Sequence, residues 1–225
     1  MEAYTKGISK EDFVSEMKMH QAADNFLKGT YDDGDQACSV GCALKSVAKL
    51  KGISLEFNEH KEFENHLGIP EWMARLNDAI FEGVSLERSK LWPVEFAEAI
   101  NDGSDLDKVK TPFLIFILKN SLASIRNAKY DQDKFSDVKN AIDQTESAVI
   151  EMIRCHENGL DLTAAKSAAE SAKSAAESAA WSAAESAESA AWSAAWSAES
   201  AKSAAKSAAF EMYADKLLEL IMECK

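Results

Sequence analysis

The sequence lacks the signals of a secreted or membrane-spanning protein. The first residues, MEAYTKGISKEDF, contain no apolar signal-peptide core, and no run of about 18 apolar residues occurs in the chain. We therefore expect a cytoplasmic location. In that setting the 4 cysteines are expected to remain thiols or to bind a metal, rather than to form disulfides.

Catalytic and cofactor-binding signatures are also missing. The chain contains no glycine-rich phosphate loop, no HExxH zinc motif and no GxSxG nucleophile turn. No cluster of Lys and Arg offsets the net charge of −13, which repels nucleic acid phosphates and anionic membrane surfaces. The sequence therefore predicts no cofactor, no nucleic acid partner and no membrane partner, and it makes an enzyme the less favoured hypothesis.

Strand signals are absent, whereas helix start and stop signals are frequent. No convincing pair of alternating strands can be found, Ser9 is placed to cap a helix, and Gly52 is placed to end one. The predicted fold is therefore all-α. We expect a helical globular domain over residues 1–160, followed by one long Ala/Ser-rich helix over residues 161–225.

The most apolar stretch of the chain is FLIFIL at residues 113–118. Thr111 and Pro112 precede it, and both residue types suit the first turn of a helix. Because the stretch is apolar on every side, it predicts a central buried helix rather than a surface one.

Neither glycine nor proline follows Gly159, and the stretch from Ala164 to Ala209 is almost a repeat of two residue types. Apart from Lys, Glu and Trp it consists of Ala and Ser, and its serines recur about every 3.6 residues. A spacing of about eleven residues per three turns favours a straight or slightly right-handed path over a left-handed coiled coil. The pattern predicts one continuous helix over this stretch.

The residues that precede the serines form a second stripe along the same helix. This stripe carries Lys and Glu at its start, then Trp181, Trp192 and Trp196, and it continues to Phe210 and Leu217. Exposed tryptophans in such a row would promote aggregation, so we expect them to be covered. The cover is either the amino-terminal helices of the same chain or a second copy, and the second alternative predicts a homo-oligomer.

The cysteines and histidines are candidates for a second kind of site. Cys38 and Cys42 are four residues apart and would share one face of a helix, while His20, His60 and His66 lie on neighbouring predicted helices. Two Cys and two His could bind zinc, although the spacing differs from the CxxC pairs of most structural zinc sites. A reactive thiol with a histidine base is another alternative. Buried, inert thiols are the favoured interpretation, so no metal is predicted.

Tyr31 lies in the acidic loop GTYDDGDQA, just before the cysteine-bearing helix. Its position suits the mouth of a pocket and equally suits a tyrosine that ends a core helix. Together with His20, Cys38, Cys42 and His60 it makes up the candidate ligand-binding residues.

Several segments of this chain resemble segments of a family of uncharacterised bacteriophage and bacterial proteins. They are Cys38-Ser39-Val40-Gly41-Cys42, then LGIPEWMARLNDAIFEG, WPVEFAEAI, the Ala-rich repeat and ADKLLELI. The family's cysteine motif reads GCxVGC, whereas Ala37 replaces its first glycine here. Lys45 stands where the family frequently has histidine. The resemblance implies a protein encoded by a mobile element that acts in the bacterial host cytoplasm.

These observations lead to two hypotheses. The first is a non-enzymatic, all-α binding protein that binds a host protein or a small ligand, with the long helix as a brace or as a link between copies. The alternative is a small thiol- or metal-dependent enzyme centred on Cys38 and Cys42, with His20 or His60 beside them.

The Trp192→Ala substitution distinguishes the two ways in which the tryptophan stripe could be buried, against its own chain or against a second copy. If the helix folds back onto its own chain, the substitution should destabilise the monomer by about 3–5 kcal/mol, as for other buried aromatics. If the stripe joins copies, the oligomeric state should fall while the melting temperature of the monomer stays nearly unchanged. Thermal unfolding and light scattering on the same variant measure both quantities, and a result in which neither moves contradicts both covers.

Overall fold

The structure is a computed structural model that describes residues 2–127, 136–174 and 191–224. The chain forms two compact units: Met1–Lys110 with Lys202–Lys225, and Thr111–Ala201. This division differs from the expected boundary at residue 160, because the end of the chain joins the amino-terminal helices. None of the described helices combines the length and apolar character needed to cross a bilayer.

The all-α prediction is confirmed for the described residues, which contain helices and isolated β-bridges but no strand. The helices of the first unit are α1 (Lys10–Ala22), α2 (Ser39–Lys51), α3 (Lys61–Leu67), α4 (Glu71–Gly83), α5 (Leu86–Ser89) and α6 (Trp92–Ala99). The remaining labelled helices are α7 (Asp107–Asn127), α8 (Ser136–Asn158) and α10 (Ala191–Glu223).

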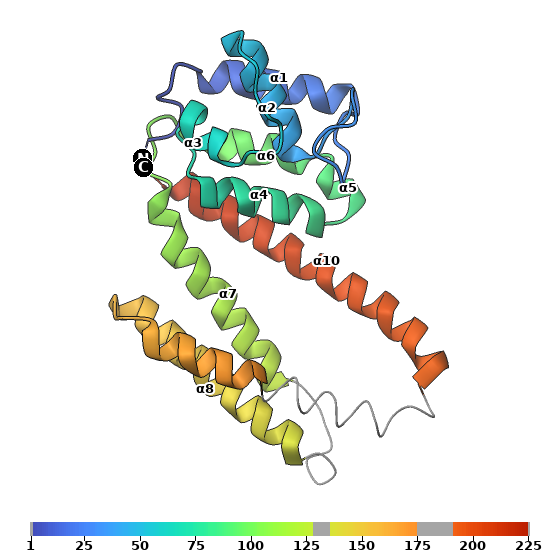
Figure 1. Ribbon diagram of the computed structural model, residues 1–225, viewed down its shortest axis with the longest axis vertical. Helices are drawn as coiled ribbons and strands as arrows, with labels where there is room; N and C mark the ends of the chain where they lie inside the picture. The colour runs from blue at the N-terminus through green and yellow to red at the C-terminus, as the bar shows by residue number, and fades with distance from the viewer. Residues whose placement is uncertain (1, 128–135, 175–190, 225) are drawn as a thin grey trace. The chain divides into compact units, whose positions relative to one another are not determined.

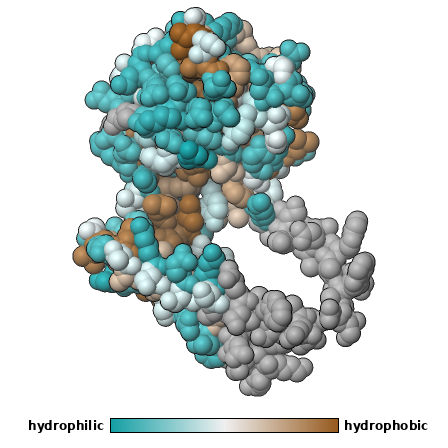
Figure 2. All heavy atoms as spheres, in the orientation of Figure 1, coloured by the Kyte–Doolittle hydropathy of each residue, from teal (hydrophilic) through white to brown (hydrophobic). Residues whose placement is uncertain are grey.

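The core of the first unit lies where α1, α2, α4 and α6 meet. Helix α1 packs on α2 and α6, and α4 packs on α2, α3 and α6 (Figure 1). The largest fully buried side chains include Phe13, Leu44, Phe81 and Trp92, one from each of these helices. By contrast, the face of this unit seen in Figure 2 is largely hydrophilic, which agrees with the acidic composition.

Local signals set several helix ends as predicted. Ser9 caps α1, since its Oγ accepts from the backbone N–H of Asp12 at 3.1 Å. Gly52 follows α2 in the left-handed conformation, with φ of 65°. Helix α1 ends at Ala22. Asp24 accounts for this, because it adopts a φ of 53° that a helix cannot continue.

The prediction of a helix over residues 113–118 is confirmed, but the prediction that this helix is buried on every side is wrong. Helix α7 begins at Asp107, so Pro112 lies inside it. Only Phe113 of the apolar run is buried, with 2% of its surface exposed, while residues 114–118 are partly covered. A run that is apolar on every side is thus not always fully buried, because burial depends on which elements pack around it.

In the second unit, α8 packs against a helical stretch at residues 163–174. Gly159, with φ of 62°, begins the turn between them, and Asp161 caps the second helix by accepting from the backbone N–H of Thr163 at 3.1 Å. Small residues allow the two helices to approach closely: Ala148 is 3% exposed and Ala165 is 0% exposed.

The predicted continuous helix over Ala164–Ala209 is covered only in part by the described residues. Residues 163–174 and α10 are helical, but residues 175–190, which include Trp181, lie outside the described part of the chain. The side chains of Trp192 and Trp196 lie outside it as well.

The carboxy-terminal part of α10 belongs to the core of the first unit. Ala214, Leu217 and Ile221 are fully buried, which confirms the expected cover for Leu217. The side-chain amide of Asn101 donates to the carbonyl groups of Met222 and Cys224, both at 3.4 Å. We call residues 206–223 the strap, because they close over the amino-terminal helices.

The contact between Gly83 and Phe210 gives a direct test of the strap. A Cβ atom at Gly83 would lie 2.2 Å from Cγ of Phe210, so Gly83→Ala should displace the ring and destabilise the protein by about 1–3 kcal/mol. In a Phe210→Ala background the same change should be neutral or stabilising, since Ala has the higher helix propensity. Chemical unfolding of the four proteins measures the coupling. Equal effects in both backgrounds would show that the ring does not pack there.

Candidate functional site

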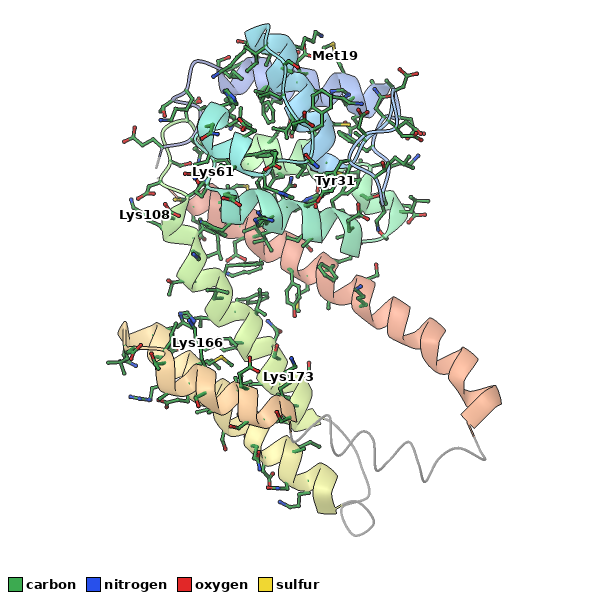
Figure 3. All side chains as sticks on the ribbon, viewed as in Figure 1. Met19, Tyr31, Lys61, Lys108, Lys166 and Lys173 are labelled. Atoms are coloured by element: carbon green, nitrogen blue, oxygen red, sulfur yellow. The ribbon has the colours of Figure 1, made fainter. Side chains whose placement is uncertain are left out.

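The structure brings three of the candidate residues together around Asp78 of α4. The Tyr31 hydroxyl donates to Oδ2 of Asp78 at 3.0 Å, and Nε2 of His60 lies 3.4 Å from the same oxygen. The rings of Tyr31 and His60 meet edge to face, with centroids 5.9 Å apart. The carboxylate of Asp78 also lies near the thiol of Cys38 and raises its pKa. Figure 3 shows Tyr31 on the connection between α1 and α2, beside α4.

Asp78 is the central residue of this cluster, and sequence reasoning missed it. Its Oδ1 atom is buried and has no hydrogen-bonding partner among the described residues. A carboxylate oxygen without a donor is costly in a buried position, so this atom is a suitable acceptor for an incoming ligand. The cluster therefore contains a buried acceptor on the residue to which Tyr31 donates.

The adjacent residue, Asn77, shows the signal that could have identified this helix. Asn77 falls on the apolar stripe of α4 with Met73 and Ile80, and it is 1% exposed. Its Oδ1 accepts from the indole N–H of Trp92 at 2.8 Å, and its Nδ2 donates to Ser39 Oγ at 3.0 Å. A polar amide on an apolar stripe must find such partners, so it marks a helix with a special role.

Cys38 and Gly41 determine how the chain enters α2 and how the loop that carries Tyr31 packs on this helix. The expectation that Cys38 and Cys42 share a helix face is wrong, because Cys38 precedes α2 as its N-cap and its Sγ accepts from the N–H of Gly41 at 3.4 Å. A Cβ atom at Gly41 would lie 1.9 Å from the carbonyl oxygen of Tyr31. Only glycine therefore allows the loop that carries Tyr31 to pack on α2.

The predicted burial of the two thiols is confirmed. Cys38 is 2% exposed and Cys42 is 0% exposed. Burial raises the pKa of Cys38 to about 12, and the nearby Asp78 carboxylate adds to the increase. Burial likewise raises the pKa of Cys42 to about 12. Because the thiolate is the reactive form, both groups are poor nucleophiles near neutral pH.

His20 and Cys42 lie outside the Asp78 cluster. Nδ1 of His20 is 3.3 Å from the side-chain nitrogen of Asn25, and Cys42 Sγ lies 3.7 Å from the carbonyl oxygen of the same residue. Burial lowers the pKa of His20. Across the described residues, no three or more His, Cys, Asp or Glu side chains are arranged to hold a metal ion, so the zinc alternative gains no geometric support there.

A surface pocket of about 450 Å³ lies beside the cluster, and we call it the Tyr31 pocket. Its lining residues are Thr30, Tyr31, Asp32, Leu55, Glu56, Phe57 and Asn58. At its edge, Lys45 Nζ lies 2.7 Å from Asp32 Oδ1 and 5.8 Å from the ring centroid of Phe57. The pocket thus combines aromatic rings with charged and amide groups, which are the usual means of holding a small polar ligand.

The predicted interaction stripe can be followed at its carboxy-terminal end. Phe210 is partly covered, and its ring meets that of Tyr213 with centroids 6.1 Å apart. The described part of the stripe therefore packs within the first unit.

Comparison with known proteins adds no relative: no protein-family model, no curated protein and no solved structure matches this chain. The class is therefore defined by the fold and the site alone, as an all-α protein with a small polar pocket and with buried thiols among its described residues.

Alkylation of the folded protein tests the environment of the thiols. At about pH 8, Cys38 should react with N-ethylmaleimide about a thousandfold more slowly than a thiol of ordinary pKa, because the thiolate fraction is that much smaller. A Ser167→Cys variant, at an exposed position, supplies the reference thiol. Mass spectrometry of peptides gives each rate. Labelling of Cys38 as fast as the reference would favour the enzyme hypothesis.

Proposed function

We propose that the protein is a non-enzymatic binding protein and that the Tyr31 pocket is its ligand site. The observation that carries this proposal is that Tyr31, which lines the pocket, donates to Asp78, whose other carboxylate oxygen is buried and has no hydrogen-bonding partner among the described residues. A ligand that enters beside Tyr31 can stack on the rings of Tyr31 and Phe57 and donate a hydrogen bond to a carboxylate.

The thiols support binding over covalent catalysis. In the alternative function, Cys38 or Cys42 would attack a substrate with His20 or His60 as base. Cys38 is closest to meeting this requirement, since its thiol lies near Asp78, which in turn lies 3.4 Å from His60. However, its thiol is 2% exposed and its pKa is raised to about 12, the opposite of what an activated nucleophile needs.

The wider setting of the proposal comes from composition and from the resemblance described above. We propose that the protein is encoded by a phage or mobile element and acts in the bacterial host cytoplasm on a host protein or a small ligand. We propose further that the Ala/Ser stretch forms one continuous helical arm, whose Trp181, Trp192 and Trp196 join copies into a homo-oligomer. A net charge of −13 disfavours nucleic acid and anionic membranes as partners.

A fragment screen by nuclear magnetic resonance tests the ligand site. Small aromatic fragments that carry an amide or amine donor should shift the amide signals of residues 30–32 and 55–58. Tyr31→Ala should weaken this binding by roughly tenfold or more, because it removes the ring and the cover over Asp78.

Leu86→Ala is the matched control, since this residue is 62% exposed and does not line the pocket. It should leave fragment binding unchanged. Shifts that gather elsewhere on the molecule, or that persist in the Tyr31→Ala variant, would contradict the assignment of the site.

A further inference from the structure

A cluster of charged side chains fastens the strap to the first unit. The guanidinium of Arg88 in α5 lies 3.0 Å from Glu95 Oε2 in α6 and 3.0 Å from Asp215 Oδ1 in α10. On the adjacent turn of α10, Oε1 of Glu211 accepts from the backbone N–H of Ser85 at 3.0 Å and from its hydroxyl at 2.7 Å. We call these five residues the clasp.

The clasp contains more negative than positive charge. Glu95, Glu211 and Asp215 contribute three carboxylates, whereas Arg88 contributes one guanidinium. Glu98 stands one turn from Glu95 on the same helix, where it pairs with Lys18 of α1 at 2.6 Å. The contact of Arg88 with Glu95 is a charge contact without good hydrogen-bond geometry. Oε2 of Glu95 and Nε of Arg88 are both buried and lack a hydrogen-bonding partner among the described residues.

These surroundings favour the neutral form of Glu95. Burial raises the pKa of Glu95 above its ordinary 4.5, and the carboxylates of Asp215, Glu211 and Glu98 raise it further, while Arg88 opposes the change. Two of the three carboxylates, Asp215 and Glu211, belong to the strap. When the strap leaves, Glu95 loses both of them and gains water, so its pKa falls back toward the ordinary value.

The direction of the pH effect follows from linkage. A carboxyl group whose pKa is higher in the docked state binds its proton more tightly there, so protonation stabilises docking. Docking is therefore strongest below the raised pKa of Glu95. Docking weakens as the pH rises through that pKa, because Glu95 then loses its proton and becomes a third, poorly compensated carboxylate beside Asp215 and Glu211.

We propose that the clasp makes the strap a pH-dependent lock, which docks firmly at mildly acidic pH and loosens as the pH rises. Loosening uncovers Ala214, Leu217 and Ile221, together with the surface of α4 at Gly83 that Phe210 covers. This inference does not depend on the Tyr31 pocket.

Amide hydrogen exchange of the full chain, corrected for the intrinsic pH dependence of exchange, tests the lock. Protection of residues 206–223 should be highest near the ordinary pKa of a glutamate and should fall as the pH rises through the raised pKa of Glu95, by up to tenfold for each unit by which docking raises that pKa. Protection of the core helix α2 should not follow this change. If the protection of the strap in the unmodified protein does not change with pH, or increases with pH, the proposal is overturned.

Two substitutions on the same helix identify the group that titrates. Glu95→Gln should hold the strap in its acid-like, well-protected state at every pH tested, because the side chain stays neutral. Glu98→Gln is the matched control and should keep the wild-type pH dependence, since Glu98 is 47% exposed and pairs with Lys18. If Glu95→Gln retains the pH dependence, or Glu98→Gln abolishes it equally, the clasp is not the origin of the effect.

Discussion

The hydrogen bonds of one buried amide hold the first unit together. Asn77 connects three helices, since it lies on α4 and bonds to Ser39 on α2 and to Trp92 on α6. The three side chains are at most 1% exposed, so a lost partner would leave a buried polar group unsatisfied at a cost of about 1–3 kcal/mol. The apolar contacts around them are adaptable, whereas these bonds require one relative position of the helices.

The same helix connects this core to the candidate site. Asp78 follows Asn77 directly, accepts from Tyr31 and lies close to His60, so the position of α4 sets the position of both rings. The close approach of the Tyr31 carbonyl to Gly41 fixes the loop from the other side. A site that is rigid before its ligand arrives loses little conformational freedom on binding, which suits a binding protein.

Features that depend on neighbouring residues could be predicted from the sequence, and features that depend on distant ones could not. Ser9 and Gly52 were identified because a cap acts within one turn of its helix. The convergence of Tyr31, Cys38 and His60 on Asp78 required the packing of α4 against two loops, which no local pattern records. For the same reason the stripe of α10 predicted that Leu217 is covered, but it did not predict that Gly83 receives Phe210.

The central claim is that the hydrogen bonds of Asn77 hold α4, the helix that carries Asp78, against α2 and α6. The exchange rate of the Trp92 indole hydrogen tests this claim most directly. This hydrogen is donated to Asn77 Oδ1 and belongs to a residue that is 0% exposed. If α4 and α6 are locked together, it should exchange only through global unfolding, with the same protection as the slowest amides of α2. Exchange much faster than those amides would show that α4 and α6 separate locally, and it would contradict a rigid, pre-formed site.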